Sequence, residues 1–199
     1  MRTKPGFRTT KTLLAGLVML YPLSTLRALD FTPEFIETEL EAGVKNREVV
    51  LKDGDARVVY CPPAGWRPEP GERRLRFHAP GVSFADLTIE AEKVPTRRAV
   101  EAADVDRCRA WLKSSVPDES SEVAMEADET NPGSVANCPT LGMTVVYTSG
   151  GVRYRKRVIY AFTPNLEIRF TTVARVADFN RLYPAVRQSL FSWRWERAN

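Results

Sequence analysis

Residues 143–162 read MTVVYTSGGVRYRKRVIYAF, and this stretch decides the fold. Two runs rich in β-branched and aromatic residues, 143–147 and 152–162, flank the segment Thr148-Ser149-Gly150-Gly151. Glycine adopts positive φ angles without a steric penalty, so a turn with two glycines between such runs predicts an antiparallel β-hairpin.

Further strands are predicted on both sides of the hairpin. The turn Lys52-Asp53-Gly54-Asp55 separates two β-branched runs within residues 48–60, and residues 73–78 and 84–92 form another pair. A short strand is predicted at 122–125, and residues 166–170 alternate apolar and polar side chains. Six to eight strands, mostly joined by tight connections, indicate a mainly antiparallel sheet.

Three helices are predicted around these strands. A short one spans residues 32–43, a longer one with an apolar face spans 97–115, and a closing one spans 178–191. Pro184 either dents the closing helix or marks its true first turn. Helices between and after antiparallel strands cover the sheet, so the predicted fold class is α+β: a mainly antiparallel sheet with helices packed on its faces, an α/β/α sandwich.

The first 28 residues have the parts of a secretory signal peptide. A region with basic and no acidic residues precedes the apolar run Leu13–Tyr21, and Ala28 supplies a small residue at the cleavage position. The run is shorter than the roughly 20 apolar residues that span a bilayer. We therefore expect a cleaved leader at 1–28, an N-terminal segment at 29–47 and the main domain at 48–199. Leu26 fits the −3 position poorly, so an uncleaved anchor is the alternative.

The charge of the chain depends on this leader. The full sequence has 29 Lys and Arg against 25 Asp and Glu; without the five basic residues of the leader, 24 remain and the net charge is −1. The basic surplus therefore gives no reason to expect a nucleic-acid partner. Within the domain, residues 101–130 are acidic and residues 150–199 basic. Either these are two solvated faces of one domain, or the basic end meets an anionic partner.

Three cysteines, Cys61, Cys108 and Cys138, follow the leader. Export would place them in an oxidising compartment, where one intramolecular bridge is possible. Cys108 lies on the apolar face of the predicted helix at 97–115, which leaves Cys61–Cys138 as the predicted disulfide; three free thiols in the core are the alternative. The cysteine spacing matches no zinc pattern and there is one histidine, so we expect no metal site and no cofactor.

Three arginines occupy alternate positions of one predicted strand. Arg153, Arg155 and Arg157 must point to the same side of the sheet, because strand side chains alternate. The other side carries an apolar and aromatic set that Lys156 interrupts: Tyr154, Val158, Tyr160 and Phe162. Guanidinium groups in a row can bind carboxylates or phosphates. The alternative is that they pair with acids on neighbouring strands or on the acidic helix.

The order of elements resembles a known family. A strand that runs into Pro63-Ala64-Gly65-Trp66 precedes a hairpin, a long helix, more antiparallel strands and a closing helix that reads FNRLYPAVRQSLF over 179–191. Over residues 48–195 this order is similar to the PsbP-like domains, α/β/α sandwiches that include subunits of the photosynthetic oxygen-evolving complex and a Ran-binding protein. The resemblance implies a binding or scaffolding module and transfers neither a partner nor a functional residue.

Three functions remain under consideration. The leading hypothesis is an exported, non-catalytic module that binds or scaffolds another envelope or extracellular protein and has no membrane span once its leader is cleaved. The second is a small enzyme with an unrecognised site, which the absence of phosphate-loop and nucleophile-elbow motifs disfavours. The third is a binder of an anionic ligand or polymer on the arginine-lined sheet face.

Overall fold

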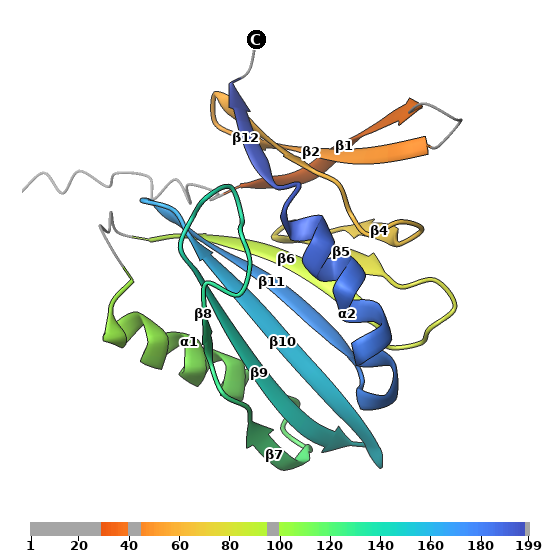
Figure 1. Cartoon of the computed structure of the whole chain (residues 1–199), viewed down its shortest axis with the longest axis vertical. Helices are drawn as coiled ribbons and strands as arrows, with labels where there is room; N and C mark the ends of the chain where they lie inside the picture. Colours follow the sequence, from red (N-terminus) through yellow and green to blue (C-terminus); the bar gives the residue numbers. More distant parts are fainter. Residues whose placement is uncertain (1–28, 40–44, 95–99, 198–199) are drawn as a thin grey trace, which may run out of the picture.

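The computed structural model describes residues 29–39, 45–94 and 100–197, so the predicted leader at 1–28 lies outside the described residues. Figure 1 shows that the last described strand returns to the sheet in which the first described strands lie. None of the helices in the described ranges has the length and apolar character needed to cross a membrane.

The described residues form twelve strands and two helices. The strands are β1 Asp30–Glu39, β2 Lys45–Asp53, β3 Ala56–Tyr60, β4 Arg67–Pro70, β5 Arg74–His78, β6 Asp86–Lys93, β7 Ser121–Met125, β8 Glu129–Thr130, β9 Thr140–Ser149, β10 Val152–Phe162, β11 Leu166–Arg175 and β12 Arg194–Arg197; the helices are α1 Ala102–Ser114 and α2 Val176–Leu190. The small sheet has the order β1-β2-β3-β12, and the large one β4-β5-β6-β11-β10-β9-β7, with β8 also paired to β9. Strand pairing is antiparallel throughout, which confirms the α+β class.

The β9–β10 hairpin forms as predicted and is longer than its apolar runs. Its register extends from Ser149 opposite Val152 to Thr140 opposite Ala161. The turn is the pair Gly150-Gly151, with φ angles of 55° and 75°. Positive φ at both central residues matches the right-handed twist of the two strands, and glycine adopts it without strain.

The two helices pack on opposite faces of the large sheet. On β10, Ile159 and Ala161 belong to the core that includes the apolar side of α2. Their neighbours Val158 and Tyr160 belong to a second core, together with Cys108 and other apolar residues of α1. Since successive strand residues point to opposite faces, α1 and α2 lie on different sides of β10.

The small sheet covers the part of the α2-side face that α2 leaves open. Its buried residues join the same core as Leu75 and Phe77 of β5. Trp193, which follows α2 and is 1% exposed, links the layers. Its ring centroid lies 5.7 Å from that of Tyr60 on β3 and 5.1 Å from that of Phe170 on β11.

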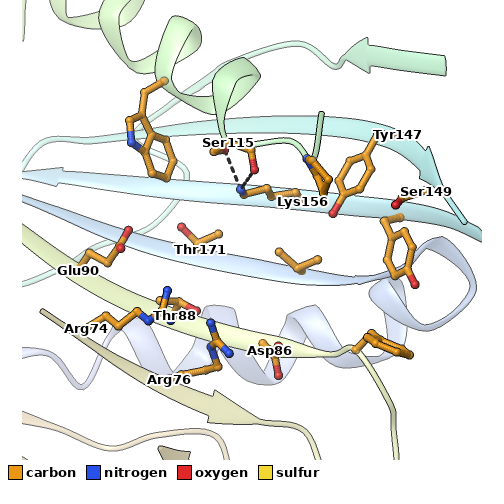
Figure 2. Close-up of a pocket in the computed structure, with 15 residues that line it drawn as sticks. Arg74, Arg76, Asp86, Thr88, Glu90, Ser115, Tyr147, Ser149, Lys156 and Thr171 are labelled. Atoms are coloured by element: carbon orange, nitrogen blue, oxygen red, sulfur yellow. Dashed lines mark hydrogen bonds between the residues drawn. The ribbon is translucent and has the colours of Figure 1, made fainter. Parts of the chain in front are cut away.

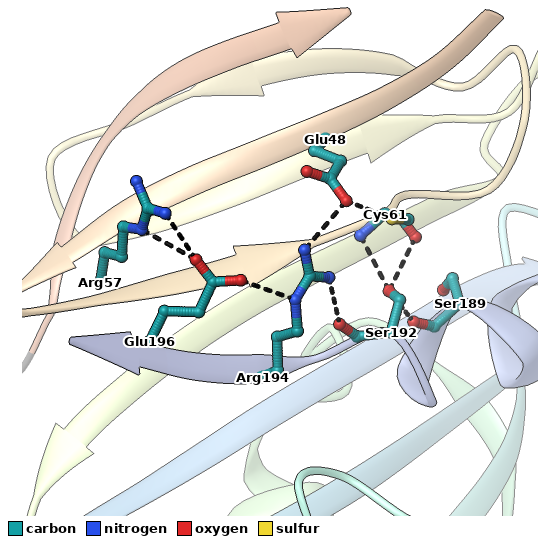
Figure 3. A network of polar contacts seen from close by, with 7 residues as sticks. All are labelled: Glu48, Arg57, Cys61, Ser189, Ser192, Arg194 and Glu196. Carbon is teal, nitrogen blue, oxygen red and sulfur yellow. Dashed lines mark hydrogen bonds and ion pairs between the residues drawn. The ribbon is translucent and has the colours of Figure 1, made fainter. Parts of the chain in front are cut away.

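Ion pairs connect β12 to the neighbouring strands of the small sheet (Figure 3). Glu196 accepts hydrogen bonds from Arg57 of β3 and from Arg194, with ion-pair distances of 2.7 and 2.9 Å. Arg194 also reaches Glu48 of β2 at 3.0 Å. The two arginines lower the pKa of the Glu196 carboxyl through these hydrogen bonds. The last strand is thus tied to both β2 and β3.

The sequence-based prediction differs from the structure in the N-terminal segment. The helix predicted at 32–43 is wrong: residues 30–39 form β1, and Phe35 stands opposite Val49 of β2. A helix-capping pattern is a weak local preference, and pairing with a β-branched neighbour strand overrides it. The predicted six to eight strands also fall short of the twelve in the described part, since β1, β4, β8 and β12 were not expected as strands.

Both longer helices are present. The helix predicted at 97–115 runs from Ala102 to Ser114, and residues 95–99 lie outside the described part. The closing helix starts at Val176, two residues before its predicted start, and Pro184 lies in its interior rather than at its first turn.

Replacing Trp193 with alanine should separate the layers that it joins. We expect a loss of about 3–5 kcal/mol in the free energy of unfolding, measured by chemical denaturation. Trp193→Phe is the matched control and should cost less, because it keeps ring contacts and removes a buried indole N–H that lacks a hydrogen-bond partner among the described residues. A cost below about 1 kcal/mol for the alanine variant would contradict this role.

Candidate functional site

Helix α1 covers only part of its side of the large sheet. Its buried residues Cys108 and Leu112 pack with side chains of β9 and β10. Further along the sheet, Leu87 and Ile89 of β6 point into the opposite core, so Thr88 between them faces the α1 side, beyond the strands on which α1 packs among the described residues. The face formed there by β5, β6 and β11 is polar and forms the floor of a recess.

Strand register places the floor of this recess in rows. Arg76 on β5 stands opposite Thr88 on β6, which stands opposite Thr171 on β11. In the neighbouring row Asp86, Val173 and Lys156 lie on successive strands. The recess has a volume of about 490 Å³. It is lined by Arg74, Arg76, Phe84, Asp86, Thr88, Glu90, Trp111, Ser115, Pro117, Tyr147, Ser149, Tyr154, Lys156, Thr171 and Val173 (Figure 2).

Lys156 is the most buried charged group in the recess, with 9% of its surface exposed. Its Nζ donates hydrogen bonds to the backbone oxygen and to Oγ of Ser115, both at 2.7 Å (Figure 2). It also lies 5.6 Å from the centroid of the Trp111 ring. Burial lowers the pKa of the amine to about 8, and nearby Glu90 opposes this change. The sequence pattern had marked this residue as the interruption of an otherwise apolar strand face.

Two hydrogen-bond donors on the floor have no hydrogen-bond partner among the described residues. Thr171 is 7% exposed and its Oγ1 is buried without a hydrogen bond, as is Nε of Arg76. Neither Arg74 nor Arg76 makes an ion pair with another described residue within 4.0 Å. Buried polar groups in folded proteins are nearly always paired, so these positions make the recess a candidate binding site.

One acid of the recess is engaged by the histidine. His78 Nδ1 lies 2.6 Å from Asp86 Oδ1, and its other nitrogen contacts Glu69 of β4. The hydrogen bond with Glu69 is the main cause of a raised pKa of the imidazole, and Asp86 adds to it. Because both ring nitrogens face carboxylates, the Cys–His pair of a thiol enzyme is not formed at this histidine.

The arginines predicted as a binding stripe lie on the opposite, α2-side face. Arg155 forms an ion pair with Glu126 at 2.8 Å and a hydrogen bond to Asn180 of α2. Arg157 pairs with Glu129 at 2.7 Å. These contacts match the alternative of pairing with neighbouring acids, and they join the acidic and basic stretches of the sequence. Arg153 is exposed and has no ion pair among the described residues; a binding role for the three arginines stays a prediction.

Arg157 is held more closely than its neighbours. Its side chain is 11% exposed and also donates to Tyr183 Oη and Thr144 Oγ1, at 2.8 and 3.0 Å. Gly142 on β9 leaves the space that the guanidinium needs: a Cβ there would lie 2.9 Å from Nη2 of Arg157. This arginine is therefore part of the packed structure beneath α2.

The predicted Cys61–Cys138 disulfide is not formed in the structure, where none of the three cysteines is in a disulfide. Cys61 Sγ contacts Glu48 Oε1 at 3.6 Å, beside the end of α2 (Figure 3). Cys138 lies in the loop before β9, where its Sγ contacts the Ala136 oxygen at 3.7 Å and burial raises the pKa of its thiol. Cys108 is buried on the apolar face of α1, as predicted. Within the described ranges, no cluster of three or more His, Cys, Asp or Glu side chains could hold a metal ion.

Comparison with known proteins rests on structure. No family model and no curated protein sequence matches the chain. The solution structure of cyanobacterial PsbP from Synechocystis sp. PCC 6803 matches with a TM-score of 0.52 and 10% identity, over 70% of this chain and 86% of that one. LpqN, involved in cell envelope biogenesis of Mycobacterium tuberculosis, matches with a TM-score of 0.50 and 12% identity, over 81% and 91%. The fold is PsbP-like.

This finding confirms the resemblance seen in the element order. At such low identity the likeness shows the fold alone, and the PsbP-like fold does not by itself assign a partner. Sequence reasoning did not predict the recess, because its shape depends on cross-strand register and on how far α1 extends over the sheet. Lys156, which interrupts an apolar strand face, was the one sign of it in the sequence.

The buried amine of Lys156 should make the free energy of unfolding of this domain depend on pH. Lys156 has an ordinary pKa of 10.5 when unfolded and about 8 when folded, so between these values the unfolded state binds more protons and stability rises with pH. Denaturation of the wild type and of Lys156→Met at pH 7 and pH 10 measures this. From pH 7 to pH 10, the free energy of unfolding of the wild type should rise by on the order of 3 kcal/mol more than that of the variant. If both proteins change by the same amount, the pKa of Lys156 is not lowered.

The arginine stripe offers a matched pair of variants. Arg157→Gln should lower the free energy of unfolding by roughly 1.5–3 kcal/mol, because it removes charged hydrogen bonds from a mostly buried position. Arg153→Gln, on the same face but exposed, should change it by less than about 0.5 kcal/mol. The melting temperatures of both variants, compared with that of the wild type, test this prediction. Equal melting temperatures would mean that the Arg157 contacts contribute nothing to stability.

Proposed function

We propose that this protein is an exported, non-catalytic module that binds another extracytoplasmic protein through the recess beside α1. In this proposal the large sheet with its two helices is the α/β/α sandwich predicted from the sequence, and residues 1–28 are the export signal. Phe84, at the rim of the recess, is the observation that carries the assignment of this face. It is 64% exposed and has a φ angle of 59°.

A phenylalanine in this conformation is costly for the free protein. Positive φ is an outlier for a bulky residue, and such strain costs about 1–3 kcal/mol. Exposure of the ring adds apolar surface in water, although the Arg175 guanidinium lies 5.7 Å from the ring centroid. Strained backbone is typical of binding sites, and exposed aromatic side chains are enriched at protein interfaces. Both features favour contact with a partner.

The remaining rim supports the same interpretation. Tyr147 and Tyr154 stack at a centroid distance of 5.6 Å at the tip of the β9–β10 hairpin, and Trp111 stands on α1. Aromatic rings around a polar floor are the arrangement of an interface with anchoring contacts. Lys156, the buried amine of the recess, donates to two acceptors of Ser115 and is thereby positioned as a hydrogen-bond donor.

Export is supported by the signal-like leader and by the nature of a structural neighbour. LpqN is described as involved in cell envelope biogenesis, and its fold is similar over most of this chain. The proposed partner is therefore another envelope or extracellular protein. Neither a cofactor nor a metal ion is part of the proposal.

Photocrosslinking from two neighbouring positions of β10, whose side chains point to opposite faces of the sheet, tests the proposal. A photoreactive amino acid is placed at Tyr154, which lines the recess, or at Arg153, its neighbour on the other face, in the full-length protein in its native cells. We expect a specific protein adduct from position 154 and none from position 153. Adducts of equal yield from both positions, or from 153 alone, would place the interface elsewhere.

The role of Phe84 is tested in the same experiment. Phe84→Gly should raise the free energy of unfolding by about 1 kcal/mol, since glycine relieves the positive φ, and it should reduce the adduct from position 154 several-fold. A more stable protein with weaker binding separates function from folding. Unchanged crosslinking in this variant would show that the strained ring does not take part.

A further inference from the structure

We infer that the floor of the recess binds a single carboxylate that is attached to an apolar body, with Arg76 and Thr171 as the hydrogen-bond donors and Lys156 as a second positive charge. This inference rests on the proposed function, because it names the chemical group that the recess recognises. It differs from the predicted anion site on the arginine stripe, which lies on the other face of the sheet and whose Arg155 and Arg157 are already paired with acids.

The two unpartnered atoms define what the ligand must supply. Nε of Arg76 carries a hydrogen, and the Thr171 hydroxyl can donate one, so both need an acceptor. They stand in one row of the floor, separated by Thr88. Lys156 uses two of its three N–H donors on Ser115, which leaves one for another acceptor. An anionic oxygen ligand meets all of these needs.

The charges around the floor limit the ligand to a low negative charge. Three basic residues line the recess against two acidic ones, Asp86 and Glu90. Asp86 is hydrogen-bonded to His78, and Glu90 stands opposite Arg74 in the β5–β6 register. A ligand with several negative charges, such as a phosphate chain, would be repelled by the two carboxylates. A ligand with one carboxylate carries a single negative charge, which the surplus of one basic residue in the recess can neutralise.

The size and walls of the recess describe the rest of the ligand. A volume of about 490 Å³ far exceeds that of a carboxylate group, and the walls include the rings of Trp111, Tyr147 and Tyr154. Apolar walls with a few placed polar groups are typical of sites for an apolar ligand with one anchoring group. Such a carboxylate has two sources: the C-terminal residue of a partner protein, or a free small acid.

Four probes test the inference by calorimetric titration of the full chain. N-acetylphenylalanine and its amide differ only in the carboxylate, and an eight-residue peptide that ends in phenylalanine is used as free acid and as amide. We expect the acids to bind at least about tenfold more tightly than the amides. Tight binding of the peptide acid identifies a protein C-terminus as the source; binding of the small acid alone identifies a free acid. Inorganic phosphate should not compete.

Thr171→Val separates binding from folding. It keeps the shape of the side chain and removes a hydroxyl that has no partner among the described residues, so the melting temperature should stay equal or rise while the affinity for the acids falls about tenfold. Arg153→Gln, on the opposite face, is the control and should leave the affinity unchanged. Equal affinity for acid and amide, effective competition by phosphate, or unchanged affinity in Thr171→Val would each overturn the inference.

These outcomes are separable from failure of the proposed function. If position 154 crosslinks to a protein and acids and amides bind alike, the carboxylate site is wrong and the protein interface stands. If the acids bind tightly and no protein is crosslinked from position 154, the carboxylate site stands and the protein partner is wrong.

Discussion

The structure depends on strand β10, whose two faces are buried in two different cores. Val158 and Tyr160 pack under α1, and their neighbours Ile159 and Ala161 pack under α2. A shift of one residue in register would exchange the two sets and place each against the wrong helix. The paired glycines of the β9–β10 turn fix this register from one end, so the whole layered arrangement follows from local turn chemistry and strict alternation.

The two faces of the large sheet are covered unequally, and the candidate site results from this difference. The α2 side is closed by α2 and by the small sheet, whereas in the described part of the chain the α1 side has only a thirteen-residue helix over β9 and β10. Side chains of β5, β6 and β11 on that side are therefore mostly polar, and two of them keep donors without a partner among the described residues. Unpaired donors and the positive φ of Phe84 both cost stability, and such costs are common at binding sites, in agreement with the proposed role of this face.

Much of the fold could be predicted from sequence, because its hairpins are specified by neighbouring residues. The turns at 52–55 and 148–151, the apolar face of α1 and the closing helix depend on contacts within a few positions. Strand β1 was mistaken for a helix because its identity comes from pairing with β2, and β12 was missed because four residues become a strand only beside β3. The recess was beyond prediction for the same reason: it joins strands that are distant in the chain, and only the buried Lys156 left a mark in the pattern.

The return of the chain to its first sheet has a consequence for folding. Glu196 meets Arg57 across a separation of 139 residues, so the small sheet is completed by a strand that is synthesised long after its partner β3. Contacts of such long range carry a high entropic cost of closure and form slowly. Until β12 arrives, β3 presents an open edge that can pair with another chain, and the exposed strand is then a point of aggregation. Completion of the small sheet is therefore a late step that protects the whole domain.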